Sequence, residues 1–148
     1  MVRRATLADI DQLLDLEDAS FRGDRIARRN FRHLLTKAHA VTFVDASGAA
    51  VAGYISVLFN RSSTVARVYS VAVAPEARGT GVGRRLVGAA EEAAAAAGCR
   101  KVRLEIREDN AASISLFTKL GYSRFTTVED YYEDHAPALR FEKRLSPA

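Results

Sequence analysis

Apolar residues near the start of the chain recur at helical spacing. After a short possible strand over Val2–Ala5, this pattern predicts a helix that runs to about Ser20. One face of that helix carries Ile10, Leu13, Leu14, Glu17 and Phe21. A second amphipathic helix is predicted after Gly23, among several arginines, with apolar positions at Ile26, Phe31, Leu34 and Leu35.

Polar side chains mark the starts of both helices. Thr6 followed by Asp9 is a variant of the capping box, in which a hydroxyl and a carboxylate satisfy backbone N–H groups. Asp24 is a suitable N-cap for the second helix. The first part of the chain is therefore interpreted as one strand followed by two helices.

The period changes after Ala40, where strand-forming residues replace the helical pattern. We expect three strands here: one around Val41 and Phe43, then Val51–Phe59 and Thr64–Val73. The turns Ala46–Gly48 and Asn60–Ser63 that join them are short. The three strands should therefore form an antiparallel meander.

Helices and strands alternate in the second half of the chain. Val82–Ala97 is rich in alanine and predicts a helix, after which Lys101–Arg107 alternates between apolar and charged residues as a strand does. Because a crossover helix precedes it, this strand should run parallel to Thr64–Val73. Three elements complete the chain: a helix between Asn110 as N-cap and Gly121 as C-cap, and strands over Tyr122–Val128 and Ala138–Leu145. With no linker or repeat, residues 1–148 are expected to form one α+β domain.

Composition narrows the functional classes. Hydrophobic residues at 48% and charged residues at 27% are ordinary for a globular protein. The net charge of +4 is spread along the chain without interleaved aromatic residues, so we expect no direct contact with nucleic acid. The single Cys99 gives no disulfide and no cysteine-based metal cluster, and no metal is expected. Lacking a signal-peptide core and a membrane-spanning run, the sequence predicts a soluble, cytoplasmic protein with no membrane partner.

A glycine-rich turn joins the last strand of the meander to the alanine-rich helix. It reads Arg78-Gly79-Thr80-Gly81-Val82-Gly83-Arg84. Glycines let the backbone approach a ligand closely, and the first N–H groups of a helix have no partners inside it. A phosphate-bearing ligand is therefore expected at this turn.

Two common phosphate loops do not fit this turn. A Walker A loop needs lysine after its second glycine, and five residues after Gly79 the chain has Arg84 with no lysine following. A dinucleotide fingerprint needs a third glycine three residues after Gly81, and that position is again Arg84. The pattern that matches is Arg-x-x-Gly-x-Gly, which resembles the acetyl-coenzyme A pyrophosphate loop of the GNAT superfamily of N-acetyltransferases.

Two later stretches strengthen this resemblance. Leu104-Glu105-Ile106-Arg107 and Asn110-Ala-Ala-Ser-Ile-Ser-Leu-Phe-Thr-Lys-Leu-Gly-Tyr122 are similar to the superfamily's later motif. The resemblance implies α/β/α layers, about four helices, and a mixed, mostly antiparallel sheet of about seven strands that is splayed between the fourth and fifth. Within the superfamily the chain is most similar to the ribosomal-protein alanine N-acetyltransferases, although His135 stands where that group usually has glycine.

The resemblance implies that acetyl-coenzyme A (acetyl-CoA) is the co-substrate. Its pantetheine would lie in the gap between the splayed strands, and the glycine-rich turn would hold its pyrophosphate. The implied cofactor-binding residues are Val71, Ala72, Val73, Arg78, Gly79, Thr80, Gly81, Val82, Gly83, Arg84, Asn110, Ser113 and Phe117.

Glu105 is the candidate general base for acetyl transfer. It lies on the polar face of the splayed strand, where the resemblance places the incoming amine, and it would act through water. The competing interpretation is a surface carboxylate paired with Arg103 and Arg107, two residues to either side.

The proton donor for the departing thiolate is less evident, because Phe117 stands where the superfamily commonly has tyrosine. Expelling an unprotonated thiolate at pH 7 costs only about 2 kcal/mol relative to the thiol, since a thiol has a pKa near 8.5. Tyr131, Tyr132 or water could replace the missing tyrosine. Both tyrosines stand in the acidic stretch Glu129–Asp134, which is either an amine-binding lip or a solvated hairpin, with residues 20–24 as the opposite lip by family analogy.

The sequence as a whole predicts an N-acetyltransferase, an acyltransferase acting on a primary amine. The preferred acceptor is the N-terminal α-amino group of a protein or peptide, with a ribosomal protein as candidate partner. A lysine side chain or a small-molecule amine is the alternative acceptor, and a non-catalytic acyl-CoA-binding module is the alternative class. The oligomeric state is not predicted.

Overall fold

The computed structural model of the chain describes residues 1–20, 26–36, 39–48 and 50–146. Its elements are β1 (Val2–Arg4), α1 (Ile10–Ser20), α2 (Arg28–Thr36), β2 (Ala40–Ser47), β3 (Ala50–Leu58), β4 (Val65–Val73), α3 (Val82–Ala96), β5 (Lys101–Arg107), α4 (Ala111–Lys119), β6 (Ser123–Val128) and β7 (Ala138–Arg144). Short 3-10 helices at Leu7–Asp9 and Pro75–Ala77 precede α1 and α3. The order of strands and helices expected from the sequence is confirmed.

Within the described residues, seven strands form one mixed sheet in the order β1-β2-β3-β4-β5-β7-β6. Neighbouring strands are antiparallel except for β4 and β5, which run parallel because α3 carries the chain back between them. The predicted α+β fold, with a mostly antiparallel seven-stranded sheet and four α-helices in the described part of the chain, is confirmed.

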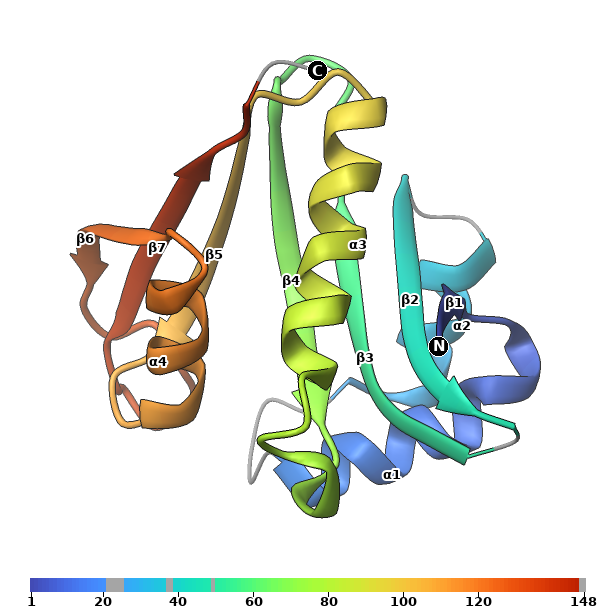
Figure 1. Ribbon diagram of the computed structural model, residues 1–148. Helices are drawn as coiled ribbons and strands as arrows, with labels where there is room; N and C mark the ends of the chain where they lie inside the picture. Colours follow the sequence, from blue (N-terminus) through green and yellow to red (C-terminus); the bar gives the residue numbers. More distant parts are fainter. Residues whose placement is uncertain (21–25, 37–38, 49, 147–148) are drawn as a thin grey trace.

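The sheet opens between β4 and β5 (Figure 1). In the described part of the chain, the two strands pair only where Val65–Arg67 meets Lys101–Arg103. Beyond that point β4 continues along β3 to Val73, whereas β5 continues along β7 to Arg107. The expected splay is therefore confirmed, and the facing edges of the two strands offer backbone N–H and C=O groups to a ligand.

Different helices cover the two faces of the sheet. On one face, Leu86 and Val87 of α3 are buried in a core with Ile55 and Val102, residues from strands on both sides of the splay. On the other face, α1 packs on β3 and β4 and α2 packs on β2 (Figure 1), in a second core that includes Tyr54. On this second face the polar side chains of β5 and β7 lie outside the two cores.

Polar caps fix the ends of several elements as expected. The capping box is present, since Thr6 N donates to Asp9 Oδ2 at 2.7 Å. The N-cap of α4 is also confirmed, because Ser113 N donates to Asn110 Oδ1 at 3.1 Å. The proposed N-cap Asp24 lies outside the described residues, as does most of the lip expected at 20–24.

A β-bulge in β4 was not expected from the sequence. Val57 pairs with Val68 while the preceding Ser56 pairs with Ser70, so Tyr69 is an extra residue in β4. Because of this insertion, Val68 and Val71 both pack into the core beneath α3. The bulge therefore lies in β4 just beyond the last residues that pair with β5.

Among the helices that the structure describes, none has both the length and the apolar character needed to cross a membrane.

Candidate active site

The loop between β4 and α3 has a backbone shape that favours glycine. Gly79 and Gly81 have φ angles of 79° and 88°, a left-handed region that residues with a side chain rarely adopt. Gly81 is the N-cap of α3. The N–H groups of the residues that follow it therefore have no hydrogen-bond partners within the helix. Figure 1 places this end of α3 near the open end of the gap between β4 and β5. The geometry fits an anionic group such as a pyrophosphate.

The third glycine of the loop has a packing role. A Cβ atom on Gly83 would lie 2.9 Å from Leu116 Cδ2 of α4. Glycine at this position therefore lets α3 approach α4 closely. The contact of Gly83 with a cofactor stays a prediction, as do those of Thr80 and Val82.

Arg85 fastens the loop to the sheet. Its Nε donates to Asp45 Oδ2 at 2.8 Å, and its Nη1 donates to Thr80 O at 3.3 Å. Burial alone would raise the pKa of Asp45, but hydrogen bonds from the N-terminal ammonium and from Arg85 outweigh burial and lower that pKa. The side chains of Arg78 and Arg84 are exposed and form no hydrogen bond or ion pair with any described residue, so their charges are available to a phosphate.

The residues of β4 expected to bind pantetheine line the splay with their backbone. Val71, Ala72 and Val73 pair with β3 along one edge, and the other edge faces the gap. The side chains of Val71 and Val73 pack under α3, whereas Ala72 is buried on the opposite face. Because the side chains are used in packing, main-chain groups are what this segment can offer to a ligand.

The expected cofactor residues of α4 have structural roles in this chain. The side chain of Asn110 caps the helix by accepting from Ser113 N. Phe117 has no exposed surface and packs edge-on against Tyr122 with ring centroids 5.1 Å apart. Tyr122 donates its hydroxyl to Glu91 of α3 at 2.7 Å, so it is committed to the core beneath α3.

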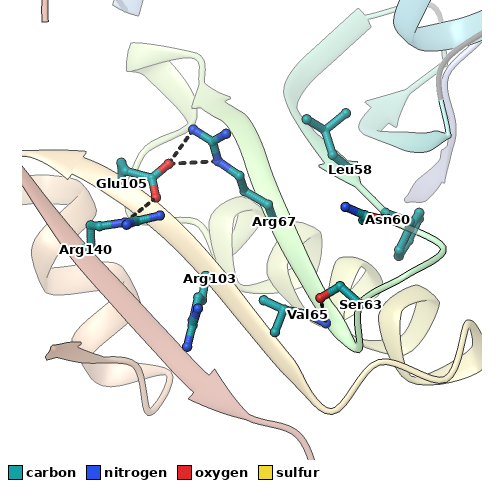
Figure 2. Close-up of a pocket in the computed structure, with 9 residues that line it drawn as sticks. Leu58, Asn60, Ser63, Val65, Arg67, Arg103, Glu105 and Arg140 are labelled. Atoms are coloured by element: carbon teal, nitrogen blue, oxygen red, sulfur yellow. Dashed lines mark hydrogen bonds and ion pairs between the residues drawn. The ribbon is translucent and has the colours of Figure 1, made fainter. Parts of the chain in front are cut away.

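Glu105 is the centre of a polar cluster on the other face of the splay (Figure 2). Its side chain is only 6% exposed. Glu105 Oε1 accepts from Arg67 Nε at 2.8 Å, and Oε2 accepts from Arg140 Nε at 3.1 Å. A carboxylate with this little exposure needs such charged donors, because an unpaired buried charge is costly.

The structure does not contain the pairing of Glu105 with Arg103 and Arg107 that the competing interpretation required. Arg103 Nε instead donates to Glu142 at 2.8 Å, and Arg107 pairs with Asp134 of the loop before β7. Arg140 lies directly opposite Glu105 in the β5–β7 ladder. Facing residues on paired strands are about 5 Å apart, against nearly 7 Å for residues two apart on one strand, so the cross-strand partner is favoured.

Tyr131 joins this cluster, whereas the ring of Tyr132 packs beside Arg107. The Tyr131 hydroxyl accepts from Arg67 Nη2 at 2.9 Å and lies 3.4 Å from Glu105 Oε1, to which it can donate. Burial and the negative charge of Glu105 raise the pKa of Tyr131. The ring of Tyr132 lies under Arg107, with its centroid 5.3 Å from the guanidinium carbon.

The loop that presents Tyr131 is tightly folded. Tyr131 N and Tyr132 N both donate to Ala136 O at 3.2 Å. His135 has a φ angle of 70°, a conformation that favours glycine, and its ring contacts Asp130. This backbone gives a physical reason why glycine suits the position that His135 occupies here.

A further buried carboxylate, Glu17, was not singled out as a candidate from the sequence. Glu17 of α1 is 1% exposed and accepts hydrogen bonds from the hydroxyls of Tyr54 and Ser70 and from Ile26 N. Burial raises the pKa of Glu17. The signal in the sequence was a glutamate on the apolar face of the first helix, one turn after Leu13.

The cluster borders a pocket of about 390 Å³ on the face that carries Glu105. Arg67 belongs to β4, Glu105 to β5 and Arg140 to β7, and Figure 2 shows both arginines pointing toward Glu105. The lining residues are Leu58, Phe59, Asn60, Ser63, Val65, Arg67, Arg103, Glu105 and Arg140. In the described part of the chain, no group of three His, Cys, Asp or Glu side chains is arranged to hold a metal ion.

The comparison with protein families identifies the class. The model of the Acetyltransferase (GNAT) family matches residues 8–122, which include the glycine loop and Glu105. The chain therefore belongs to the GNAT family of acetyltransferases. It is an acyltransferase, and this family uses acetyl-CoA as co-substrate.

Individual relatives cover nearly the whole chain. A Bacillus subtilis (strain 168) protein named as a candidate [ribosomal protein bS18]-alanine N-acetyltransferase is 28% identical, over 90% of this chain and 87% of its own length. A thialysine N-epsilon-acetyltransferase of Bos taurus is also 28% identical, over 92% of this chain and 81% of its own. The crystal structure of the ribosomal-protein-S18-alanine N-acetyltransferase from Escherichia coli has the same fold, with a TM-score of 0.84 and 21% identity over 100% of this chain and 95% of that one.

Proposed function

We propose that this acyltransferase moves acetyl from acetyl-CoA to the α-amino group of a protein or peptide N-terminus. The position of Glu105 carries the proposal. It is a nearly buried carboxylate beside a pocket, near the point where β4 and β5 separate. It accepts a hydrogen bond from Arg67 and lies near the Tyr131 hydroxyl. Acetyl-CoA supplies an activated acyl group, and the chain must hold it, accept a proton from the amine and return a proton to the thiolate.

The first task belongs to the loop and strand on the other side of the splay. Backbone N–H groups from Arg78 to Arg84 would bind the pyrophosphate, and the side chains at both ends of this segment would add positive charge. Main-chain groups of Val71–Val73 would bind the pantetheine amides. Asn110, whose Oδ1 is occupied by the helix cap, keeps its amide N–H groups for the same ligand.

The second task belongs to Glu105. An α-amino group has a pKa near 8, against about 10.4 for a lysine side chain, so an N-terminal amine needs far less help to become neutral. The guanidinium groups of Arg67 and Arg140 next to the carboxylate further favour a neutral amine, since like charges repel. As the neutral amine nitrogen attacks the thioester carbon, it must lose one proton to become an amide nitrogen. Glu105 accepts this proton through a water molecule.

The third task is assigned to Tyr131. As the C–N bond forms and the C–S bond breaks, the phenol gives its proton to the thiolate and regains one from the protonated Glu105. Its hydroxyl is within 3.4 Å of Glu105 Oε1, whereas the ring of Tyr132 is held against Arg107. The raised pKa of Tyr131 keeps the phenol protonated at neutral pH, so the proton is present when the thiolate forms.

The relatives support this acceptor and one alternative. The names of the relatives from Bacillus subtilis and Escherichia coli favour an alanine N-terminus, and a ribosomal protein is the candidate partner. The thialysine enzyme of Bos taurus, at the same 28% identity, favours a side-chain or small-molecule amine as the second candidate. We also propose that the protein acts in the cytoplasm, as expected from the sequence.

Thiol release from acetyl-CoA, followed with three sets of acceptors, tests the proposal. The sets are peptides with a free N-terminus, the same peptides blocked at the N-terminus but carrying a lysine, and small amines that include thialysine. We expect the highest kcat/KM with free N-termini. Release only from the blocked peptides or the small amines would transfer the proposal to the second candidate, and release from none would contradict both.

A further inference from the structure

The pocket beside Glu105 extends beyond the reacting position. It runs along the paired ends of β4 and β5, where Val65 and Arg103 line it (Figure 2). An apolar wall is formed by Leu58 and Phe59 at the end of β3. An acceptor whose amine meets Glu105 would therefore place its next chemical groups in this pocket.

Positive charge dominates the pocket and its immediate surroundings. Arg67, Arg103 and Arg140 line it, and the only acidic side chain among its described lining residues is Glu105. Outside the lining, Glu142 is shared between Arg103 at 2.8 Å and Lys101 at 3.6 Å. Four cationic side chains thus face two carboxylates, which leaves an excess of positive charge beside the site of the amine.

Part of this charge is free to bind a ligand. Arg103 and Arg140 each form their ion pair through Nε, and their Nη atoms donate no hydrogen bond to a described residue. The Phe125 ring backs both guanidinium groups, with its centroid 4.9 Å from Arg103 Cζ and 5.9 Å from Arg140 Cζ. Two oriented guanidinium groups with unused N–H donors are suited to a carboxylate, which they bind with strong charge-assisted hydrogen bonds.

We infer that this pocket selects acceptors that carry a carboxylate close to the amine. The inference rests on the proposed function, because it takes Glu105 as the point where the amine reacts. Arg103 lies two residues before Glu105 on the same face of β5, a separation of nearly 7 Å. That spacing suits the side chain of an acidic second residue in a peptide better than the α-carboxylate of a free amino acid.

The loop around Tyr131 complements this arrangement. It carries Glu129, Asp130, Glu133 and Asp134, and Asp134 pairs with Arg107, which lies two residues beyond Glu105 on the side away from Arg103. An acceptor with an ammonium group and a nearby carboxylate would approach with its positive end toward this loop and its negative end toward the arginines.

The first experiment compares matched acceptors on the unmodified protein. Peptides that begin Ala-Glu, Ala-Gln and Ala-Lys but are otherwise identical are assayed for thiol release, together with free alanine and alaninamide. We expect kcat/KM to be at least about tenfold higher for Ala-Glu than for Ala-Gln, the scale of one hydrogen bond between charged groups, and lowest for Ala-Lys. The preference should decline as ionic strength rises.

The second experiment tests Arg103, which does not touch Glu105. Arg103→Gln should bring the ratio of kcat/KM between Ala-Glu and Ala-Gln peptides close to one, mainly through KM, and Arg103→Lys should keep part of the preference. Arg124→Gln is the matched control, because Arg124 lies opposite Phe141 in the β6–β7 ladder and its side chain forms no hydrogen bond or ion pair with the described residues. A purely structural role of Arg103 would lower both rates and leave their ratio unchanged.

The possible outcomes separate the two proposals. If no acceptor releases thiol, the proposed function fails. If all three peptides react equally, or if the preference survives Arg103→Gln, the proposed function stands and the carboxylate pocket is refuted. The ratio of kcat/KM between alanine and alaninamide is also compared with the ratio between the Ala-Glu and Ala-Gln peptides. If the first ratio is the larger, the carboxylate that the pocket recognises is that of a free amino acid and not a peptide side chain.

Discussion

The two sides of the splay offer different kinds of chemical group to a ligand. On the side of α3, the groups available to acetyl-CoA are main-chain N–H and C=O groups, presented by Gly79, Gly81 and the unpaired edge of β4. On the other side, the available groups are side chains contributed by different strands and a loop: Arg67, Glu105, Tyr131 and Arg140. The first side depends on backbone shape and the second on cross-strand contacts.

This difference explains what each side can recognise. A backbone cradle needs few specific side chains, so it can remain constant while the rest of the chain changes. A cluster of charged side chains can be altered one residue at a time, which makes it the natural place for acceptor choice. The same chain can therefore share its co-substrate with a large family and still select its own amine.

The largest effect is expected from a change in backbone shape on the α3 side. Gly81→Val places a β-branched residue at a φ angle of 88°, and its Cβ would lie 3.1 Å from Arg85 Nη1. We expect no detectable binding of acetyl-CoA by calorimetry while the circular dichroism spectrum of the folded protein is retained.

Gly88→Ala is the matched control for that substitution. Gly88 lies within α3, and a Cβ there would meet no atom within 4 Å. Alanine should stabilise the helix by up to about 1 kcal/mol and leave cofactor binding unchanged. Normal binding by the Gly81→Val variant would show that the loop is not the pyrophosphate site.

A change of one side chain on the other face should separate chemistry from binding. Glu105→Gln keeps the shape of the residue but removes its ability to accept a proton. We expect kcat to fall about a hundredfold or more, the usual scale for a general base, with little change in the dissociation constant of acetyl-CoA. Unchanged turnover would show that Glu105 is an ion-pair partner of Arg67 and Arg140 and not the general base.

The two tyrosines of the acidic loop should differ, although they are adjacent. Tyr131→Phe should lower kcat by up to about thirtyfold at pH 7, which corresponds to the cost of about 2 kcal/mol for an unprotonated thiolate. The deficit should shrink as the pH rises past about 8.5, where the thiolate no longer needs a proton. Tyr132→Phe serves as the control and should have a smaller effect, since the ring of Tyr132 lies against Arg107. Equal effects would exclude Tyr131 as the specific donor.

The backbone side of the site could be predicted from the sequence, because its determinants are local. The glycines, the strand before them and the helix after them stand within one short segment, so their spacing alone indicated an anion site. The parallel pair β4 and β5 also followed from the crossover helix between them.

The side-chain cluster could be predicted only in part. Glu105 was found from its motif and Tyr131 from its loop, but Arg67 and Arg140 were missed, since neither is near Glu105 in sequence. Which arginine meets the carboxylate depends on the register of β5 against β7 and on where β4 leaves β5. The bulge at Tyr69 and the burial of Glu17 against Tyr54 depend in the same way on packing between distant segments.

The smallest effect is expected where a side chain supports the backbone cradle. Arg85→Gln breaks the contact with Asp45, and because Arg85 is half exposed we expect a loss of only about 1 kcal/mol in the free energy of unfolding at pH 7. The pKa of Asp45 is lowered in the folded state, so its stabilising contribution is present above its unfolded pKa, near 4, and is lost as the pH falls through the lower folded value. The difference in the free energy of unfolding between the variant and the unmodified protein, measured with urea, should therefore become smaller below about pH 4. Acetyl transfer at pH 7 should change less than with any substitution at Glu105, since only the anchor of the loop is altered. A gap that stays constant down to pH 3 would show that Arg85 acts by packing and not through the charge of Asp45.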